Sequence, residues 1–336
     1  MAKIRLALLG SGLFARDAHL PALKALGDTY EIVAIYSRSK ENADALAAKL
    51  PNKVETYTDT APLLARTDID AVDIILAIAV QPKMVEAALR AGKHVISEKP
   101  VAPDVASGKQ LIQTVAQLTK ASGRIWMVAE NWRYEQAYRA AGEVLRRGDL
   151  GKPIQFSWVT NENVNASVKY YHTAWRRDNS FPGGFLLDGG VHDIAAIRAI
   201  MGEVESLAAF VTQVRPDLPP TDTLSATLRF DSGAFGSYTK TFAAAAPWES
   251  FIHVVGDRGA LRVNSKKLEV TVDGKTTTQM FEVNAVQAEL ADFAHLIEHG
   301  GPLKSPPVEA LQDVAIIEAM LDSGRTGQVV KPERVV

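Results

Sequence analysis

The sequence predicts an α/β protein of two domains. The first is built on a parallel sheet and the second is an α+β domain with a large, mainly antiparallel open sheet. Up to about residue 130, short apolar runs alternate with helical segments, which requires parallel strands with crossover helices. Beyond it, strand-like runs follow one another through hairpin turns such as "DSG" at 231–233. The length of 336 residues also fits two domains, which we place at 1–129 and 130–336.

The first domain is expected to alternate between strands and helices. Its strands are apolar or β-branched runs such as "EIVAIY", and its first helix shows the helical spacing of Phe14, Leu20 and Leu23. We predict strands at 3–9, 31–36, 54–57, 71–76, 94–97 and 124–128, and helices at 14–26, 41–50, 83–90 and 104–119.

The second domain is expected to be rich in strands and to have few helices. A helix at 135–147 opens it, before the turn-rich "GDLGKP". We predict strands at 154–161, 204–214, 223–230, 234–241, 250–255, 260–263, 267–272 and 276–283, and helices at 187–201, 285–299 and 308–321. These helices are enough to cover one face of the sheet. The other face can pack on a second copy, so we expect a homodimer or homotetramer, a solvated face being the alternative.

Composition excludes several classes of protein. Lys plus Arg (37) nearly balances Asp plus Glu (39), without a basic tail, so we expect no nucleic-acid partner. The absence of cysteine removes disulfides and thiolate chemistry and fits a reducing compartment. The N-terminal apolar run is too short and too charged for a signal peptide, and no run reaches membrane-spanning length. We therefore expect a cytoplasmic protein without a membrane partner.

The stretch "GSGLFA" at 10–15 lies between the first strand and the first helix. Its two glycines allow a tight turn and close approach of a pyrophosphate, the small Ala15 lets helix and strand pack closely, and the helix N-terminus favours an anion. In this position the motif predicts a Rossmann dinucleotide-binding domain that uses Gly10, Gly12, Leu13 and Phe14. A plain tight turn is the alternative.

The end of the second strand indicates which nicotinamide cofactor is bound. An acidic residue there would bind the ribose 2′-hydroxyl of NAD, but this strand ends "IYSRSK". The hydroxyl of Ser37 and the charges of Arg38 and Lys40 suit a 2′-phosphate, which an acidic residue would repel. We therefore expect NADP(H) to be preferred over NAD(H). A solvated turn in which Ser39 caps the next helix is the alternative.

Two further motifs carry polar groups that suit catalysis. "EKP" follows the fifth strand, and ligands of open parallel sheets bind at the carboxyl ends of strands, so Lys99 is expected to face the cofactor. In "LLDGGVHD", Asp188 and His192 share one helix face at i, i+4 spacing. The intervening glycines cost roughly 1 kcal/mol each in a helix, which close approach of a ligand or another backbone would explain.

With these motifs the chain resembles the Gfo/Idh/MocA family, the relatives of glucose-fructose oxidoreductase and inositol dehydrogenase. The resemblance covers essentially the whole length and rests on "GSGLFA" with "HLPAL", "AGKHVISEKP", "WRRDNSFPGG" and "DGGVHD". It implies reversible hydride transfer between NAD(P) and a sugar, polyol or similar alcohol, with catalytic residues Lys99, Asp188 and His192. The chain departs from the family at the end of the fourth strand, where many relatives carry Thr-Pro and, a few residues later, a histidine. Here those places read Leu76-Ala77 and Gln81, which puts the loop on the nicotinamide side in doubt.

The roles of the three catalytic candidates follow from their chemistry. His192 is the expected general acid/base, Lys99 is expected to stabilise alkoxide charge, and Asp188 to orient the substrate or the other two. A packed helix histidine and an N-cap are the alternatives for His192 and Asp188. No metal site is expected, since a site from Asp188, His192 and His172 lacks a tight ligand cluster.

The remaining candidates are assigned to cofactor or substrate. Amides, aromatic rings and arginines alternate over 161–178, which suits a hydroxylated ligand, a polar connection being the alternative. The predicted cofactor-binding residues are Gly10, Gly12, Leu13, Phe14, Ser37, Arg38, Lys40, Ala77, Gln81, Glu98 and Lys99. The predicted substrate-binding residues are Trp132, Arg133, Tyr171, His172, Trp175, Arg176, Asp188 and His192.

The sequence as a whole favours an NADP(H)-dependent oxidoreductase that acts on a sugar- or polyol-like alcohol or its carbonyl. Two other functions stay open: a dinucleotide-binding regulator of the same fold without catalysis, and a reductase of a non-sugar carbonyl or imine. The regulator is disfavoured because the chain keeps both Lys99 and His192.

Overall fold

The computed structural model describes residues 2–177, 181–246 and 248–336, which form two compact units. The first unit comprises the chain up to residue 130 together with 286–311, and the second comprises 131–285 and 312–336. The expected fold class is confirmed: one sheet is parallel, and the other is mixed with mostly antiparallel strands. The sequence-based division at 129/130 did not foresee that a late segment returns to the first unit.

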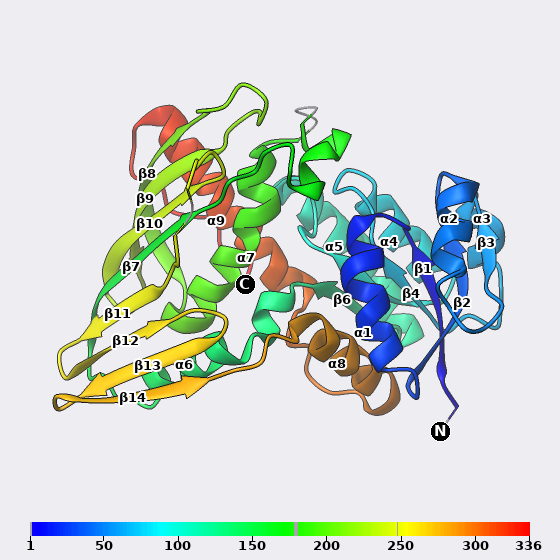
Figure 1. Ribbon diagram of the computed structural model, residues 1–336, viewed down its shortest axis with the longest axis horizontal. Helices are drawn as coiled ribbons and strands as arrows, with labels where there is room; N and C mark the ends of the chain where they lie inside the picture. Colours follow the sequence, from blue (N-terminus) through cyan, green and yellow to red (C-terminus); the bar gives the residue numbers. More distant parts are fainter. Residues whose placement is uncertain (1, 178–180, 247) are drawn as a thin grey trace. The chain divides into compact units, whose positions relative to one another are not determined.

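The sheet of the first unit has six strands within the described residues, all parallel, in the order β3-β2-β1-β4-β5-β6 (Figure 1). Its central strands read as continuous apolar runs because helices cover both faces of such a sheet. The strands are β1 Ile4–Leu9, β2 Tyr30–Tyr36, β3 Glu55–Tyr57, β4 Ala71–Ile74, β5 His94–Glu98 and β6 Trp126–Ala129.

The helices of this unit begin at side-chain caps where the sequence offers them. Ser39, Asp59 and Asp104 each accept a hydrogen bond from a backbone N–H of the helix that follows. The short α3 was not predicted from the sequence. The helical elements are η1 Ala15–His19, α1 Leu20–Ala25, α2 Lys40–Ala47, α3 Thr60–Leu64, α4 Gln81–Arg90, α5 Val105–Ser122 and α8 Ala285–His299.

Helix α8 belongs to the core of the first unit, although its position in the chain had suggested the second domain. Leu290 and Phe293 are fully buried in one apolar cluster with Leu6 of β1 and Leu23 of α1. The phenol of Tyr30 also donates a hydrogen bond to the carbonyl of Leu290 at 2.7 Å. Burial of this apolar stripe explains why the chain returns to the first sheet.

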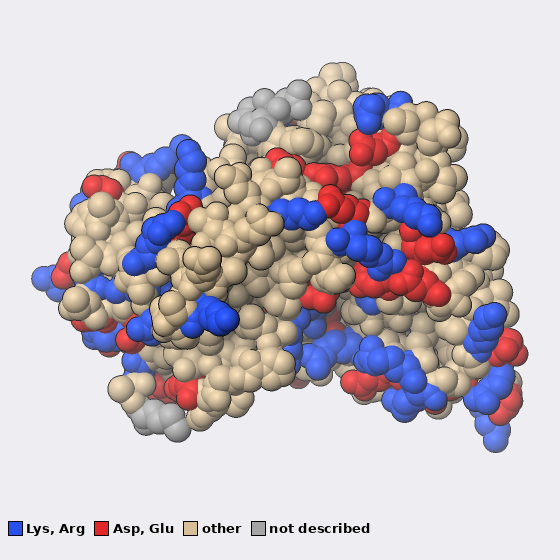
Figure 2. All heavy atoms as spheres, turned by 180° about the vertical axis from the view of Figure 1, so that it is seen from behind, with Lys and Arg blue, Asp and Glu red and all other residues tan. Residues whose placement is uncertain are grey.

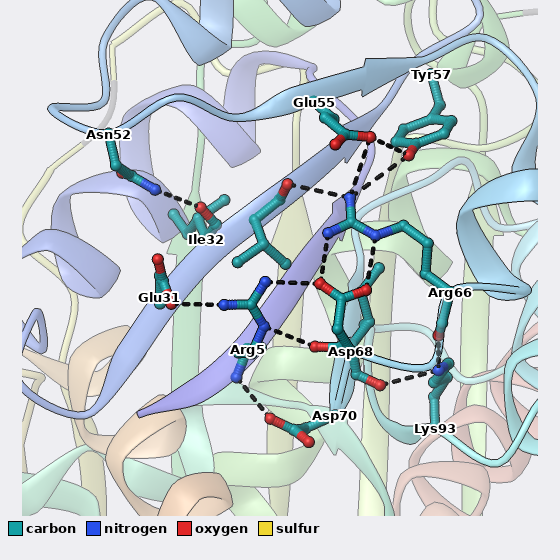
Figure 3. A network of polar contacts seen from close by, with 12 residues as sticks. Arg5, Glu31, Ile32, Asn52, Glu55, Tyr57, Arg66, Asp68, Asp70 and Lys93 are labelled. Carbon is teal, nitrogen blue, oxygen red and sulfur yellow. Dashed lines mark hydrogen bonds and ion pairs between the residues drawn. The ribbon is translucent and has the colours of Figure 1, made fainter. Parts of the chain in front are cut away.

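Ion pairs occupy the edge of the parallel sheet where its strands begin (Figure 3). The Asp68 carboxylate accepts hydrogen bonds from both Arg5 and Arg66, and these guanidinium groups hold its pKa well below the ordinary range. Lys93 donates to the carbonyl of Ile69 at 2.9 Å. This edge is taken up by contacts within the protein, which leaves the opposite edge, where the strands end, for ligands.

The sheet of the second unit has eight strands within the described residues, in the order β14-β13-β12-β11-β7-β10-β9-β8. All neighbouring strands are antiparallel except β7 and β10, which run parallel. The strands are β7 Pro153–Asn161, β8 Val204–Thr212, β9 Thr223–Phe230, β10 Phe235–Thr241, β11 Ile252–Gly256, β12 Gly259–Val263, β13 Lys267–Val272 and β14 Lys275–Met280.

Burial alternates along the central strands β9 and β10 of the second unit. In β9, Ala226, Leu228 and Phe230 are buried, whereas Ser225 and Thr227 are exposed. Helices α7 and α9 pack on the buried face of this sheet (Figure 1). The helical elements are η2 Asn131–Tyr134, α6 Gln136–Arg146, η3 Lys169–His172, η4 Ala174–Arg176, α7 Gly184–Met201 and α9 Pro307–Thr326.

Among the described residues, no helix combines the length and the apolar character that crossing a membrane requires.

Candidate active site

The phosphate loop of the first unit shows why glycine is required. Gly10 has a φ of 132°, and a Cβ atom there would lie 2.2 Å from the carbonyl oxygen of Ile75, just past β4. At Gly12, a Cβ atom would instead point into open space, with no heavy atom of the described chain within 4 Å. Ala15 is fully buried where η1 begins. A tight turn, an open approach and a helix N-terminus fit a dinucleotide pyrophosphate.

The end of β2 presents one unengaged cation. Arg38 is exposed and forms no hydrogen bond or ion pair with the described part of the chain, and Ser37 precedes it. Lys40, by contrast, is held by Asp44 at 2.5 Å and by Thr56 at 2.6 Å. Ser39 caps α2 through the N–H of Asn42, as the alternative interpretation of this segment expected. The guanidinium group of Arg38 is therefore available to an anionic ligand.

The loop after β4 contains a buried amide without a partner. Gln81, the first residue of α4, is 1% exposed, and neither its oxygen nor its nitrogen finds a hydrogen-bond partner in the described chain. The half-buried Ala77 lies in the preceding turn. A buried polar group without a partner is costly, and a ligand that bonds to the amide would remove that cost. This fits a role for Gln81 in cofactor binding.

Lys99 directly follows β5 and is half-buried. The preceding residue, Glu98, turns into the interior, where its carboxylate lies 2.9 Å from Nε2 of His19. Nδ1 of the same ring donates to Asp73 of β4 at 2.6 Å. One buried imidazole thus joins the helix after the phosphate loop to the ends of β4 and β5, and it fixes the backbone that carries Lys99.

In the second unit, α7 carries both Asp188 and His192, as the i, i+4 spacing predicted. Nε of Arg176 donates to the Asp188 carboxylate at 2.6 Å, and both side chains are largely buried. The guanidinium group of Arg176 also lies over the ring of Trp175, 4.2 Å from its centroid. The structure therefore brings together three predicted substrate-binding residues: Trp175, Arg176 and Asp188.

His192 is held against an aromatic ring. Trp132 of η2 stacks on it with the two centroids 5.3 Å apart and the planes 16° from parallel. Trp132 in turn contacts the rings of Tyr138 and Trp158. This packing restricts the rotation of the imidazole, so a half-buried titratable group has a defined direction.

The two glycines of α7 have a different origin from the one expected. A Cβ atom on Gly189 would lie 2.7 Å from the ring of Phe242, and one on Gly190 would lie 3.0 Å from Ile317. Side chains of the core, rather than a ligand or another backbone, require the small residues. The glycines are therefore explained by the packing of α7 on its neighbours and are not evidence for a bound substrate.

Three other predicted substrate residues are engaged in contacts within the second unit. Tyr171 donates to Asp217 at 2.7 Å, and the exposed His172 contacts the carbonyl of Ala166 at 2.7 Å. Arg133 is ion-paired with Asp313. Tyr171 and His172 belong to the segment 161–178, whose last residue, Asp178, lies outside the described residues.

A cluster of charged side chains, two of them buried, packs against α7. Lys240 of β10 is 2% exposed and pairs with Asp193 at 3.0 Å and with Glu162 at 2.5 Å. The phenol of Tyr238 donates to Asp193 at 2.6 Å. Asp193 follows His192 directly, so these bonds fix the helix at the position of the candidate base.

One further titratable group, Glu135, was not predicted from the sequence. Its burial raises the pKa of its carboxyl to about 7, and it precedes α6 in the same short segment as Trp132. A glutamate at the start of a helix is ordinary in sequence, so only the fold distinguishes it. A buried carboxyl that titrates near neutral pH is a common feature of functional sites.

The comparisons with known proteins agree with this architecture. A model described as an oxidoreductase family with an NAD-binding Rossmann fold matches residues 4–124, and one described as the GFO/IDH/MocA C-terminal domain matches 138–262. Dehydrogenase FPY6 of Fusarium mangiferae is 34% identical over 95% of this chain and 96% of its own. D-xylose 1-dehydrogenase (NADP(+)) 2 of Haloferax volcanii is 26% identical over 96% and 98%. A crystal structure of an oxidoreductase from Thermotoga maritima matches with a TM-score of 0.92 and 33% identity over the whole of both chains.

Fold, loop and comparisons together define an oxidoreductase with an NAD-binding Rossmann domain. The chain belongs to the Gfo/Idh/MocA family, which confirms the resemblance found in the sequence. The expected class of enzyme, a dehydrogenase or reductase, is likewise confirmed by its relatives.

We predict that Lys240→Met lowers the free energy of unfolding by about 3–5 kcal/mol, because Asp193 is then buried without its cation. Denaturant unfolding measures the loss. Lys267→Met is a matched control, since Lys267 forms its ion pair near the surface, and it should cost less than about 1 kcal/mol. Equal losses in the two variants would contradict the prediction.

Proposed function

We propose that the protein is an NADP(H)-dependent oxidoreductase that transfers hydride between the nicotinamide and a sugar- or polyol-like alcohol or its carbonyl. The observation that carries this proposal is the arrangement on α7. A half-buried imidazole, stacked on Trp132, lies one helical turn from a carboxylate that is paired with Arg176. This arrangement combines a proton acceptor with oriented polar groups for hydroxyls.

The proposed reaction divides its work among three residues. Bound NADP⁺ would accept the hydride that leaves the alcohol carbon. His192 takes the hydroxyl proton, so the substrate loses one hydride and one proton and becomes a carbonyl compound. The ammonium group of Lys99 stabilises negative charge on the reacting oxygen. Asp188, held by Arg176, accepts hydrogen bonds from substrate hydroxyls and fixes the orientation of the ring or chain.

Substrate recognition is proposed to rest on aromatic faces and charged hydrogen-bonding groups. The rings of Trp132 and Trp175 offer stacking surfaces, and Arg176 with Asp188 offers a donor next to an acceptor. A polyhydroxylated ligand needs both kinds of contact. The relative from Haloferax volcanii is named a D-xylose dehydrogenase, which favours sugars among such substrates.

Turnover assays separate this function from the two alternatives. Absorbance of reduced nicotinamide is followed with a panel of aldoses, polyols, aromatic aldehydes and cyclic imines. Turnover of the first two groups supports the proposal, and turnover of the last two alone supports a non-sugar reductase. Binding of NADPH without turnover of any compound supports a regulator.

We predict that Lys99→Met lowers kcat by about a hundredfold or more, because the alkoxide then forms without its cation. The affinity for NADPH, measured by fluorescence titration, should change little, since the pyrophosphate contacts are made by other residues. Lys49→Met, at an exposed position after α2, is the control and should keep full activity. An unchanged kcat in Lys99→Met would remove this residue from the chemistry.

The proposed preference for NADP(H) rests on Arg38. Its guanidinium group is exposed and unengaged within the described chain, and its two neighbours in the sequence are Ser37 and Ser39 rather than the acidic residue that would bind the ribose of NAD. The relative from Haloferax volcanii carries NADP(+) in its name. The buried amide of Gln81 supports a further polar contact with the cofactor.

We predict that Arg38→Ala weakens NADPH binding by about tenfold or more while NADH binding changes less than about twofold, because charged hydrogen bonds to phosphate contribute roughly 1.5–3 kcal/mol. Lys40→Ala should have a smaller effect, since Asp44 and Thr56 hold that side chain. Equal affinities of the unmodified protein for the two cofactors would refute the preference.

We further propose that the protein forms a homodimer or homotetramer through the open face of its second sheet. Phe210, Phe235 and Val159 are 87%, 55% and 40% exposed, and they lie on strands β8, β10 and β7. These apolar side chains lie among polar residues such as Ser225 and Thr239 on the same open face, and an open sheet face can pack on its two-fold mate. On the face shown in Figure 2, positive and negative side chains are intermixed, which supports a small molecule and a second copy as the partners rather than nucleic acid.

Light scattering at micromolar concentration should therefore give a mass at least twice the 36.4 kDa of the chain. Phe210→Asp should shift the mass toward that of one chain, because a carboxylate is costly to bury at an apolar contact. Thr227→Asp, on the exposed face of the neighbouring strand β9, tests how far the contact extends. A single species at the mass of one chain would rule the proposal out.

A further inference from the structure

Four titratable side chains converge in the interior of the first unit, below the backbone that carries Lys99. They are His19 of η1, Asp73 of β4, Glu98 of β5 and Glu289 of α8. All four are buried, with His19, Asp73 and Glu289 fully so. The residues are far apart in the sequence, so no motif predicted the cluster. The expectation of no metal site was based on Asp188, His192 and His172 alone.

The charges of this cluster do not balance within it. Three carboxylates face a single imidazole, so even a protonated ring leaves an excess negative charge in an apolar interior. Both oxygens of Glu289 are inaccessible to solvent, and neither has a hydrogen-bond partner in the described chain. Burial of an unpaired carboxylate costs several kcal/mol or more, so a further positive charge is required.

The geometry suits one cation. Ligand atoms of His19, Glu98 and Glu289 all lie within 4.8 Å of one another, and Nε2 of His19 is 2.9 Å from the Glu98 carboxylate. Ligands that bind an ion at about 2.0–2.2 Å are roughly 3 Å apart when adjacent and just over 4 Å apart when opposite. The separations in the cluster are therefore close to those of a coordination sphere, and a small inward movement of the side chains would complete it.

Asp73 supplies the outer contact that such sites use. Its carboxylate accepts a hydrogen bond from Nδ1 of His19 at 2.6 Å, which fixes the ring and leaves Nε2 as the atom that faces the two glutamates. A carboxylate behind a histidine is the usual way to orient a metal-binding imidazole and to raise its basicity.

We propose that His19, Glu98 and Glu289 form a structural site for one divalent transition-metal ion of the zinc or manganese type, with Asp73 as the outer-shell partner. One imidazole and two carboxylates, one of them bidentate, provide four ligand atoms of the kinds these ions accept. The site is closed to solvent, so it joins α8 to η1 and β5 and takes no part in the hydride transfer proposed above.

The competing occupant is a proton on Glu289, and substitution by glutamine distinguishes the two. Glutamine has the shape of a protonated glutamate, so a protonated site tolerates it. It cannot supply an anionic bidentate ligand, so a metal site loses affinity. Glu298→Gln, on the same helix with its carboxylate beside His299, is the matched control.

The experiment treats the full chain with a chelator, adds Zn²⁺ or Mn²⁺, removes excess ion and measures metal content and the midpoint of thermal unfolding. We expect about one equivalent of metal per chain, a higher midpoint with metal, and at least a tenfold weaker metal affinity in Glu289→Gln but not in Glu298→Gln.

Two results would overturn the site. One is an unmodified protein that retains no metal and whose midpoint does not respond to either ion. The other is a Glu289→Gln variant that binds metal as the unmodified protein does, which would place the ion elsewhere. If Glu289→Gln does not fold, the metal content and midpoint of the unmodified protein decide alone, and His19→Gln serves as the second variant. Turnover plays no part in the readout, so failure here leaves the proposed function untouched.

Discussion

The first unit depends on the burial of two carboxylates at the ends of its central strands. Asp73 is fully buried and Glu98 is only 7% exposed, and an isolated carboxylate in such a position would be costly. His19 makes their burial possible because its two ring nitrogens contact one carboxylate each. The position of His19 is set by the helix after the phosphate loop, so the loop, β4 and β5 are fixed relative to one another by one imidazole.

The second unit uses the same kind of constraint in a different sheet. Lys240 comes from a strand, and Asp193 from the helix that crosses it, and neither could be buried without the other. Burial raises the pKa of the Asp193 carboxyl, whereas Lys240 acts to lower it. The ammonium group is therefore what makes a charged Asp193 tolerable at this depth. Helix α7 is thereby held in one rotation about its axis, with His192 turned to Trp132.

Whether the sequence could predict a feature depends on how far apart in the chain the residues that determine it lie. Strand positions and the phosphate loop were predictable because apolar period and glycine spacing are local signals. The unit to which α8 belongs could not be predicted, because an apolar stripe on a helix can pack against any core. Only the folded chain shows that it packs against Leu6 and Leu23. The glycines of α7 were assigned to a ligand, although Phe242 and Ile317, distant in the sequence, require them.

The same distinction applies to the candidate site. Lys99, Asp188 and His192 were found by motif and by resemblance, and the spacing of the last two on one helix was predicted correctly. The ionic partners that surround them could not be predicted, since Arg176 and Lys240 are ordinary charged residues in the sequence. Glu135 and Glu289 differ from surface glutamates only through burial, which long-range packing decides.

In both units the candidate reactive residue is the sequence neighbour of a buried anchor. Lys99 follows Glu98, and His192 precedes Asp193. Consecutive side chains diverge, by about half a turn along a strand and by about 100° around a helix, so the neighbour of a buried group is directed away from the core. The buried neighbour, Glu98 or Asp193, fixes the backbone conformation without itself contacting the reactive side chain. A charged side chain can then be held rigidly at the edge of a core while its own atoms stay available for chemistry.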